Sequence, residues 1–223
     1  MLILAADTSG KNGSLALMRF EEESSRTLEL VSLEGGTFSA QLVPQISALL
    51  TKNGLAKSDI DAFAVASGPG SFTGLRVGLA AIKALAEILQ KPIAAISVLE
   101  AIARAPGREG RVLAVLDAGR GEVYCGEYGI RDARATLIAQ QLWTVAELVA
   151  NAAGRTVVTP DVIVAELSRE KNLQFAHIAA PRADSIARLG FEKIQAGEMV
   201  SPEALDATYI RRTDAEIKKD ARG

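Results

Sequence analysis

Apolar runs near the start of the chain predict a meander of three strands. Leu2–Ala6 is a short apolar run, and Thr8–Gly13 after it is rich in residues that favour turns. Ser14–Phe20 and Arg26–Leu33 follow as further strand candidates, separated by the polar stretch Glu21–Ser25. Because the connections are short, we expect these strands to pair in antiparallel fashion.

Helical spacing then alternates with apolar runs. In Ser39–Lys52 the apolar residues recur at intervals of three and four, although Pro44 either sits near the first turn of this helix or kinks it. Gly74–Leu89 has the same spacing and predicts a second helix. The apolar runs Asp61–Ala66 and Ile93–Ser97 predict the strands before and after it.

The same order of elements is expected a second time. Further strands are predicted at Val112–Leu116, Glu122–Tyr128, Ala135–Gln141, Thr156–Val158 and Phe175–Ile178, and helices at Thr144–Ala152, Asp161–Lys171 and Ala183–Ala196. Three strands, a helix, a strand, a helix and a strand form the order of an RNase H-like half, and two such halves form the actin-like ATPase (ASKHA) architecture. We therefore expect an α/β protein of two RNase H-like lobes with mixed sheets.

The linker between the lobes is expected at Ala105–Gly110, where Pro and Gly suit a boundary. The predicted domains are residues 1–104, which carry the interface helices described below, and a smaller lobe over 111–223. Whether the last helix returns to the first lobe stays open.

Composition excludes several kinds of protein. The 223 residues include 25 Lys and Arg against 27 Asp and Glu, one cysteine (Cys125) and one histidine (His177). A disulfide within the chain and a zinc site of Cys and His ligands are excluded, and any catalytic triad would have to use His177. The net charge of −2 argues against a chain that grips nucleic acid on its own.

Hydropathy indicates a cytoplasmic protein. Hydrophobic residues make up 48% of the chain, yet no stretch of 18 apolar residues occurs, so we expect no membrane contact. The opening MLILAADTSG lacks the basic front of a signal peptide. Cys125 and His177 both lie in apolar strand patterns, where a structural role is the simpler interpretation.

The most distinctive segment is SGPGSFTGLRVGLAAIKALA, residues 67–86. A glycine-rich loop that leads into a helix can hold an anion, and Thr73 is the expected N-cap, but the segment lacks the GK[ST] ending of a P-loop. Small residues such as Gly74, Gly78 and Ala84 make the helix surface flat. This flat surface favours either close packing on the chain's own sheet or a subunit interface.

Two aspartates occupy matching positions, since Asp7 and Asp117 each end the first strand of a half. In actin-like folds the hairpins at these places contact phosphates and metal, and the hydroxyls of Thr8 and Ser9 could reach a phosphate. The competing interpretation is an aspartate favoured in a turn.

These segments together resemble the bacterial TsaB (YeaZ) family, whose members are subunits of the machinery that makes threonylcarbamoyladenosine in tRNA. The matching segments are SGPGSFTGLRVGLAAIKALA, ILAADTS at 3–9, Ser39–Ile46, ISVLEAIA at 96–103, LDAGRGEVYCGEY at 116–128 and YIRR at 209–212. The resemblance implies a non-catalytic dimerisation subunit that forms homodimers, and heterodimers with a TsaD-like paralogue that carries the metal and transfers threonylcarbamoyl to adenosine 37. The resemblance also implies that a TsaE-like ATPase joins this complex, and that the chain contacts tRNA only as part of the complex.

The resemblance also implies which residues serve these roles. The partner-binding residues it implies are Leu42, Ile46, Leu49, Gly70, Phe72, Thr73, Gly74, Arg76, Val77, Gly78, Ala81 and Leu85. The candidate nucleotide-binding residues, which rest on the actin-like fold and are the weaker prediction, are Asp7, Thr8, Ser9 and Asp117. No catalytic residue, metal ligand or cofactor of the chain itself is expected, and ATP or ADP with Mg is left to the complex. Phe38 and Pro160 depart from the family, and Pro160 argues against independent nucleotide binding.

Two alternatives stay open on the residues alone. The chain could be an autonomous actin-like ATPase or phosphotransferase that uses Asp7 and Asp117. A zinc peptidase is the weaker alternative, because its helical H-x-x-x-H pair needs two histidines and the chain has one. The charged tail IRRTDAEIKKDARG is expected to be a solvated helix or tail, with a contact to tRNA as the lesser option.

Overall fold

The computed structural model describes residues 1–22, 24–208 and 210, and it divides into two compact units. The first unit comprises Met1–Ala101 and Ala179–Ala207, and the second includes Ile102–Ile178. The charged tail that follows Ile210 lies outside the described residues, so its contact with tRNA stays a prediction.

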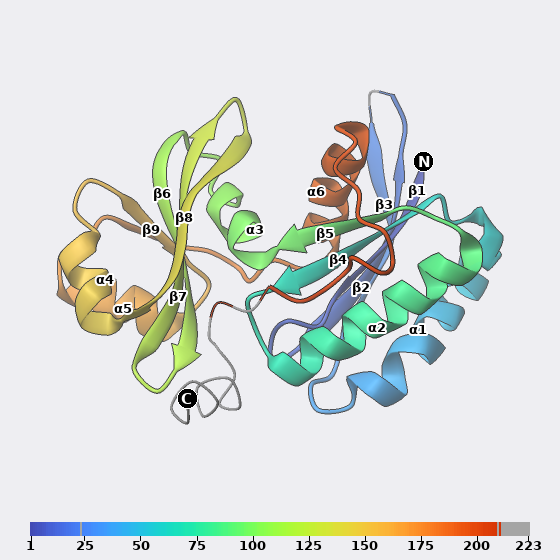
Figure 1. Ribbon diagram of the computed structural model, residues 1–223, viewed down its shortest axis with the longest axis horizontal. Coiled ribbons are helices and arrows are strands. Elements are labelled where there is room, and N and C mark those ends of the chain that lie inside the picture. Colours follow the sequence, from blue (N-terminus) through green and yellow to red (C-terminus); the bar gives the residue numbers. More distant parts are fainter. Residues whose placement is uncertain (23, 209, 211–223) are drawn as a thin grey trace, which may run out of the picture. The chain divides into compact units, whose positions relative to one another are not determined.

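The first unit is built on a mixed sheet of five strands (Figure 1). Its strands are β1 (Leu2–Asp7), β2 (Gly13–Phe20), β3 (Ser25–Leu33), β4 (Ala62–Gly68) and β5 (Ile93–Ser97), in the order β3-β2-β1-β4-β5. The predicted meander of β1, β2 and β3 is antiparallel, whereas β1, β4 and β5 run parallel.

The second unit repeats this topology. Its strands are β6 (Gly110–Gly119), β7 (Glu122–Arg131), β8 (Arg134–Thr144), β9 (Thr156–Thr159) and β10 (Phe175–His177), in the order β10-β9-β6-β7-β8. The strands β6, β7 and β8 are antiparallel neighbours, and β6, β9 and β10 are parallel. The predicted repeat of element order is therefore confirmed, and it extends to the order of strands within each sheet.

Helices cover both faces of the first sheet. The helices of this unit are α1 (Phe38–Lys52), α2 (Phe72–Leu89), α6 (Ala183–Gln195) and, beginning in it, α3 (Val98–Arg104), with a single 3-10 turn η1 (Lys57–Asp59). Figure 1 shows α1 and α2 on one side of the sheet and α6 on the other. Pro44 lies inside α1. The helix α3, which has only seven residues, was not predicted.

The expected domain boundaries are corrected by α6. This helix packs on β1, β2, β4 and β5, so Ala179–Ala207 belong to the first unit and not to a lobe over 111–223. Gly190 lies against Ala64 of β4, and the rings of Phe191 and Phe20 stack at 4.3 Å. The Ala183 amide donates a hydrogen bond of 2.9 Å to Ser14 Oγ, which ties the start of α6 to β2. The open question of the last helix is thus answered by its packing.

The helices of the second unit are α4 (Val145–Asn151) and α5 (Val162–Glu170). With the sheet they enclose a core that includes Val115, Leu148 and Val157. Cys125 lies in this core at 1% exposure, as expected for a small structural residue, and burial raises the pKa of its thiol to about 12. None of the helices among the described residues combines the length and apolar character needed to cross a membrane.

We expect Gly190→Val to lower the free energy of unfolding by about 1–3 kcal/mol, because its Cβ would lie 2.5 Å from the Cβ of Ala64. Urea titration followed by circular dichroism measures this change. Gln195→Val, at the exposed end of the same helix, is the control and should cost less than about 0.5 kcal/mol. Equal costs for the two variants would contradict the packing of α6 on the first sheet.

Candidate functional site

The turn after β1 is held closed by its own side chains. Asp7 Oδ1 accepts hydrogen bonds from the Ser9 amide at 2.9 Å and from the Ser9 hydroxyl at 2.6 Å. This local pattern is the reason that aspartate is favoured in turns. Asp7, Thr8 and Ser9 are all buried, with exposed fractions of 7, 2 and 7%.

Three glycines let α2 lie directly on this turn. A Cβ at Gly70 would meet Ser9 O at 2.3 Å, and one at Gly74 would meet Thr8 O at 2.1 Å. At Gly78, one turn further along α2, a Cβ would lie 2.3 Å from Thr8 Oγ1. Gly70 and Gly74 therefore let backbone approach backbone, and Gly78 leaves room for the Thr8 side chain, all within the first unit.

Hydrogen bonds join the same two segments. Thr8 Oγ1 donates to Gly74 O at 2.7 Å, and the Ser71 amide donates to Ser9 O at 2.6 Å. Ser71, and not the expected Thr73, is the N-cap of α2, and its Oγ accepts from the Gly74 amide at 3.2 Å. This correction moves the start of the helix by two residues.

This geometry bears on the predicted nucleotide set. A phosphate is bound by N–H and O–H groups that point into an open site. The hydroxyls of Thr8 and Ser9 already donate within the protein, and both residues are buried. The turn does not fit a nucleotide phosphate in this arrangement.

The surroundings of Asp7 shift the pKa of its carboxyl group. Burial raises its pKa above the ordinary value, and the two hydrogen bonds from Ser9 offset part of this effect. A raised pKa means that the folded state binds the proton of this group more tightly than the unfolded state does.

Asp117 occupies the matching strand end of the second unit, but in a different setting. It is exposed, its Oδ1 accepts from the Gly119 amide at 2.9 Å, and its own amide donates to Asp161 Oδ2 at 2.7 Å. His177, at the end of β10, lies with Nε2 3.2 Å from Pro160 O. Among the described residues, no three His, Cys, Asp or Glu side chains are placed to hold a metal ion.

The predicted partner-binding residues divide into three groups. Leu42, Ile46 and Leu49 lie in the core of the first unit, with 1, 5 and 2% of their surface exposed. Their side chains therefore pack α1 against this core and do not face a partner. Gly74 and Gly78 are likewise buried. Gly70, Val77, Ala81 and Leu85 are half-buried. Phe72, Thr73 and Arg76 are exposed, and the Arg76 guanidinium lies 3.8 Å from the centre of the Phe72 ring.

Sequence reasoning found part of the outward face of α2, with Thr73, Arg76 and Ala84, but it missed the outward face of α1. We call the two outward faces together the outer helix face; its exposed residues are Ala40, Val43, Pro44, Ser47, Ala48 and Thr51 on α1 and Thr73, Arg76, Ala80, Ala84, Glu87 and Ile88 on α2. Val43 and Ile88 stand out, with 57 and 72% of their surface exposed. The signal was present in the sequence, because these positions lie on the side of each helix opposite to the buried ones.

The comparisons with known proteins agree with the resemblance. The sequence model of the TsaD family, described as tRNA N6-adenosine threonylcarbamoyltransferase, matches residues 35–199. The tRNA threonylcarbamoyladenosine biosynthesis protein TsaB of Escherichia coli is 30% identical over 96% of this chain and 96% of its own length. The chain belongs to the TsaB (YeaZ) family. TsaB of Bacillus subtilis is 39% identical, over 57% of this chain and 55% of that protein.

Two solved structures have the same fold as this chain. YeaZ from Pseudomonas aeruginosa matches with a TM-score of 0.74 and 27% identity, over 93% of this chain and 99% of that one. An uncharacterized protein with similarity to peptidase YEAZ, also from Pseudomonas aeruginosa, matches with a TM-score of 0.78 and 28% identity, over 94 and 99% of the two chains. The predicted actin-like, RNase H-like fold class is confirmed by the two matching sheets and these neighbours.

A double-mutant cycle tests the contact between α2 and the turn. Gly78→Ala should lower the free energy of unfolding by about 1–3 kcal/mol, since its Cβ meets Thr8 Oγ1. In a Thr8→Ala background the obstructing oxygen is gone, so the same change should stabilise by up to about 1 kcal/mol through helix propensity. Urea titration of the four proteins measures both effects. An effect of equal sign and size in the two backgrounds would contradict the contact.

The protonation of Asp7 predicts a dependence of stability on pH. Because the pKa is raised in the folded state, the stability contributed by this group is greatest at acidic pH and declines as pH rises above the unfolded value of 3.8. Asp7→Asn keeps an oxygen acceptor for Ser9 but does not titrate. The free energy of unfolding of the variant, relative to the natural chain, should therefore rise between acidic and neutral pH. A pH-independent difference would show that Asp7 titrates normally.

Proposed function

We propose that this chain is a non-catalytic subunit of the assembly that transfers threonylcarbamoyl to adenosine in tRNA, and that it pairs through the outer helix face. The pathway is the one named for TsaB of Escherichia coli, which the chain resembles over nearly its full length. The pairing partners are a TsaD-family protein and a second copy of this chain. A TsaE-like ATPase and the tRNA join through that pair.

The observation that carries this proposal is the unusual composition of the outer helix face. On α1 this face has no charged side chain before Lys52, and on α2 Ala80, Ala84 and Ile88 form a stripe at intervals of four residues. An ordinary solvent-facing helix would carry charged residues there. Small and apolar residues allow a second pair of helices to approach closely and to remove Val43 and Ile88 from water.

The alternative of an autonomous ATPase has less support. Its phosphate-binding turn would be Asp7–Ser9, which the chain's own loop already covers. The other aspartate of that hypothesis, Asp117, has one carboxylate oxygen engaged with the Gly119 amide. We therefore assign no catalytic residue to this chain and leave nucleotide with Mg to the assembled complex.

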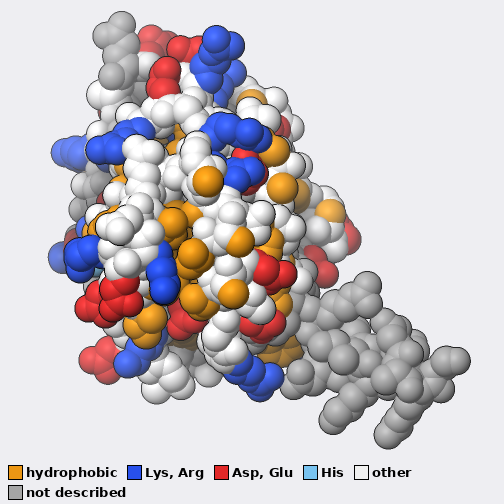
Figure 2. Space-filling model, turned by 90° about the vertical axis from the view of Figure 1, so that its left-hand side faces the viewer, with side chains coloured by type: hydrophobic (Ala, Val, Ile, Leu, Met, Phe, Trp, Pro, Cys, Tyr) orange, Lys and Arg blue, Asp and Glu red, His pale blue; other side chains and the backbone are white. Residues whose placement is uncertain are grey.

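The test replaces an exposed apolar residue on each of two surfaces. Ile88→Asp on α2 should weaken pairing with the TsaD-family protein of the same cell by about thirtyfold or more, as expected for a central apolar contact. Ile163→Asp on α5 is a matched control, because both isoleucines are 72% exposed. The control variant therefore changes the face of the second unit on which α4 and α5 lie in Figure 1. Figure 2 views this face and shows that hydrophobic side chains gather on it too.

Size-exclusion chromatography with light scattering measures homodimers, and co-purification of tagged protein measures the mixed pair. The proposal expects Ile88→Asp to reduce both while thermal stability stays unchanged. If Ile163→Asp disrupts pairing and Ile88→Asp does not, the interface lies on the second unit. If neither variant matters, the outer helix face is not the pairing surface.

A further inference from the structure

The second unit is neutral as a whole, yet its charges are separated between the two edges of its sheet. Residues 102–178 contain nine Lys and Arg and nine Asp and Glu. The strands β6, β9 and β10 are parallel, so all three begin at the same edge, where β7 ends and β8 begins. We call this the starting edge of the second sheet. The helices α4 and α5 precede β9 and β10 in the chain and therefore also end there.

Positive side chains gather at the starting edge. Seven of them lie on it with four negative ones: Arg108, Arg111, Arg131, Arg134, Arg155, Arg169 and Lys171 with Glu109, Glu127, Asp132 and Glu170. The opposite edge has the reverse balance, with Asp117, Glu122, Glu147 and Asp161 against Arg120. Each edge thus carries about three charges in excess, of opposite sign.

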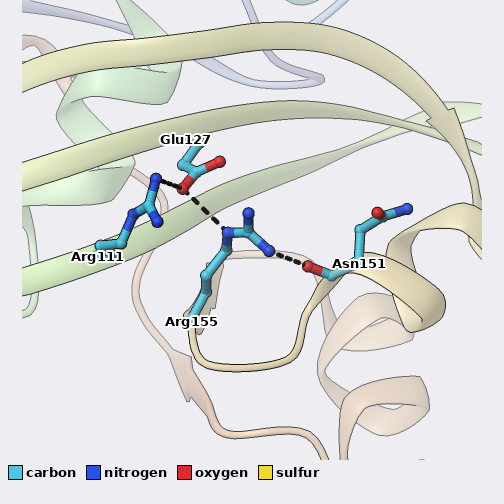
Figure 3. A network of polar contacts seen from close by, with 4 residues as sticks. All are labelled: Arg111, Glu127, Asn151 and Arg155. Atoms are coloured by element: carbon cyan, nitrogen blue, oxygen red, sulfur yellow. Dashed lines mark hydrogen bonds and ion pairs between the residues drawn. The ribbon is translucent and has the colours of Figure 1, made fainter.

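Some of these cations have a structural role. Figure 3 shows Glu127 between the side chains of Arg111 and Arg155. Its Oε1 lies 2.9 Å from a terminal nitrogen of Arg111 and 3.0 Å from Arg155 Nε. Glu127 is 9% exposed, so the two arginines compensate a buried carboxylate. Arg169 and Lys171 lie at the end of α5, where the helix dipole favours positive charge. These four cations are explained within the unit.

Three arginines have no such explanation. Arg108, Arg131 and Arg134 are exposed, and the described residues provide no ion pair or hydrogen bond to their side chains. Arg131 stands directly opposite Arg134 across the two-residue turn between β7 and β8. Like charges at directly opposed positions destabilise a strand pair, and a bound anion would relieve this repulsion.

The first unit provides an internal comparison. In its hairpin Arg19 also stands opposite Arg26, but there the turn begins with Glu21 and Glu22. In the second unit the turn carries Asp132, and the nearby Glu109 accepts a hydrogen bond from the Asp132 amide at 3.2 Å. The arginine pair is common to both hairpins, whereas the excess of positive charge belongs to the second.

We propose that the starting edge of the second sheet binds the phosphate backbone of the RNA on which the complex acts. This proposal rests on the proposed function, which brings tRNA to the assembly. The guanidinium group matches the geometry of phosphate oxygens, and all three unpaired cations are arginines. The contact supplements the partner's binding surface, because a chain with a net charge of −2 has little attraction for RNA by itself.

The experiment uses the full chain in complex with the TsaD-family protein of the same cell and a transcript of a substrate tRNA. Fluorescence anisotropy gives the dissociation constant over a series of KCl concentrations. The triple variant Arg108→Ser, Arg131→Ser, Arg134→Ser should raise this constant about tenfold at low salt. A plot of the logarithm of the dissociation constant against the logarithm of the KCl concentration should also become less steep, by about 2 units of slope. Each lost phosphate contact removes somewhat less than one unit.

Two control variants separate charge from fold. The pair Arg19→Ser, Arg26→Ser removes the matched arginines of the first hairpin and should leave tRNA affinity and slope unchanged. The triple replacement of Arg108, Arg131 and Arg134 by lysine keeps the charge and should keep the salt slope. An unchanged slope in the serine variant, or an equal loss in the first-hairpin control, would overturn the proposal.

Failure of the proposed function would look different. If the natural chain does not pair with the TsaD-family protein, the proposed pairing is wrong. Cross-linking of a high concentration of the chain alone to the tRNA transcript then decides the RNA contact: cross-links to the segments that hold Arg108, Arg131 and Arg134 support it, and cross-links elsewhere or none overturn it. If the serine variant pairs poorly but binds tRNA normally once paired, the starting edge serves an acidic protein partner, and the RNA proposal is overturned.

Discussion

The first unit depends on one close contact, that of α2 with the turn that follows β1. The start of α2 and the turn touch because Gly70, just before the helix, and Gly74 within it have no side chains to separate the backbones, and Gly78 leaves room for the Thr8 side chain. The hydrogen bond from Thr8 Oγ1 to Gly74 O fixes the contact at its centre. Any larger residue at these positions would lift the helix from the sheet and expose the aliphatic core beneath it.

This contact also determines what α2 presents to the outside. An α-helix repeats every 3.6 residues, so positions four apart stay near the same face. The glycine row that ends at Gly78 faces the turn, and the row of Ala80, Ala84 and Ile88 faces outward. The small residues of the distinctive segment thus serve two purposes: close packing on one side and, on the other, a row of small residues that lies between Arg76 and Glu87. The two interpretations of the segment apply to different residues of the same helix.

Most of the fold could be predicted from the sequence, because local patterns carry it. Strand alternation and helical spacing located the ten strands and five of the six α-helices found among the described residues, and the repeated order of elements predicted two related units. The destination of α6 could not be predicted in this way. Its pattern shows that one face is buried, but the contact between Gly190 and Ala64, which decides which sheet covers that face, joins residues far apart in sequence. The helix α3 has only seven residues, too few for a clear period.

The candidate site was predicted less well, for a related reason. The residues Leu42, Ile46 and Leu49 have the spacing of a contact surface, and a contact surface is what they form, but with the chain's own core. Spacing alone does not distinguish a face that packs inward from one that packs against a partner. Likewise, the hydroxyls of Thr8 and Ser9 are suited to phosphate only if they are free, and their engagement becomes visible only in three dimensions.

The net charge of the chain did not reveal the proposed RNA-binding edge either. It sums charges from two edges of the second sheet, and these edges carry excesses of opposite sign. Parallel strands bring Arg111 and Arg155 to one edge of the second sheet and Asp117 and Asp161 to the other, and the total hides this separation. Under the proposed sharing of RNA with a partner, a local excess of positive charge is enough, because the partner supplies the rest of the binding surface. A neutral chain with a polarised unit meets that need without attracting nucleic acid indiscriminately.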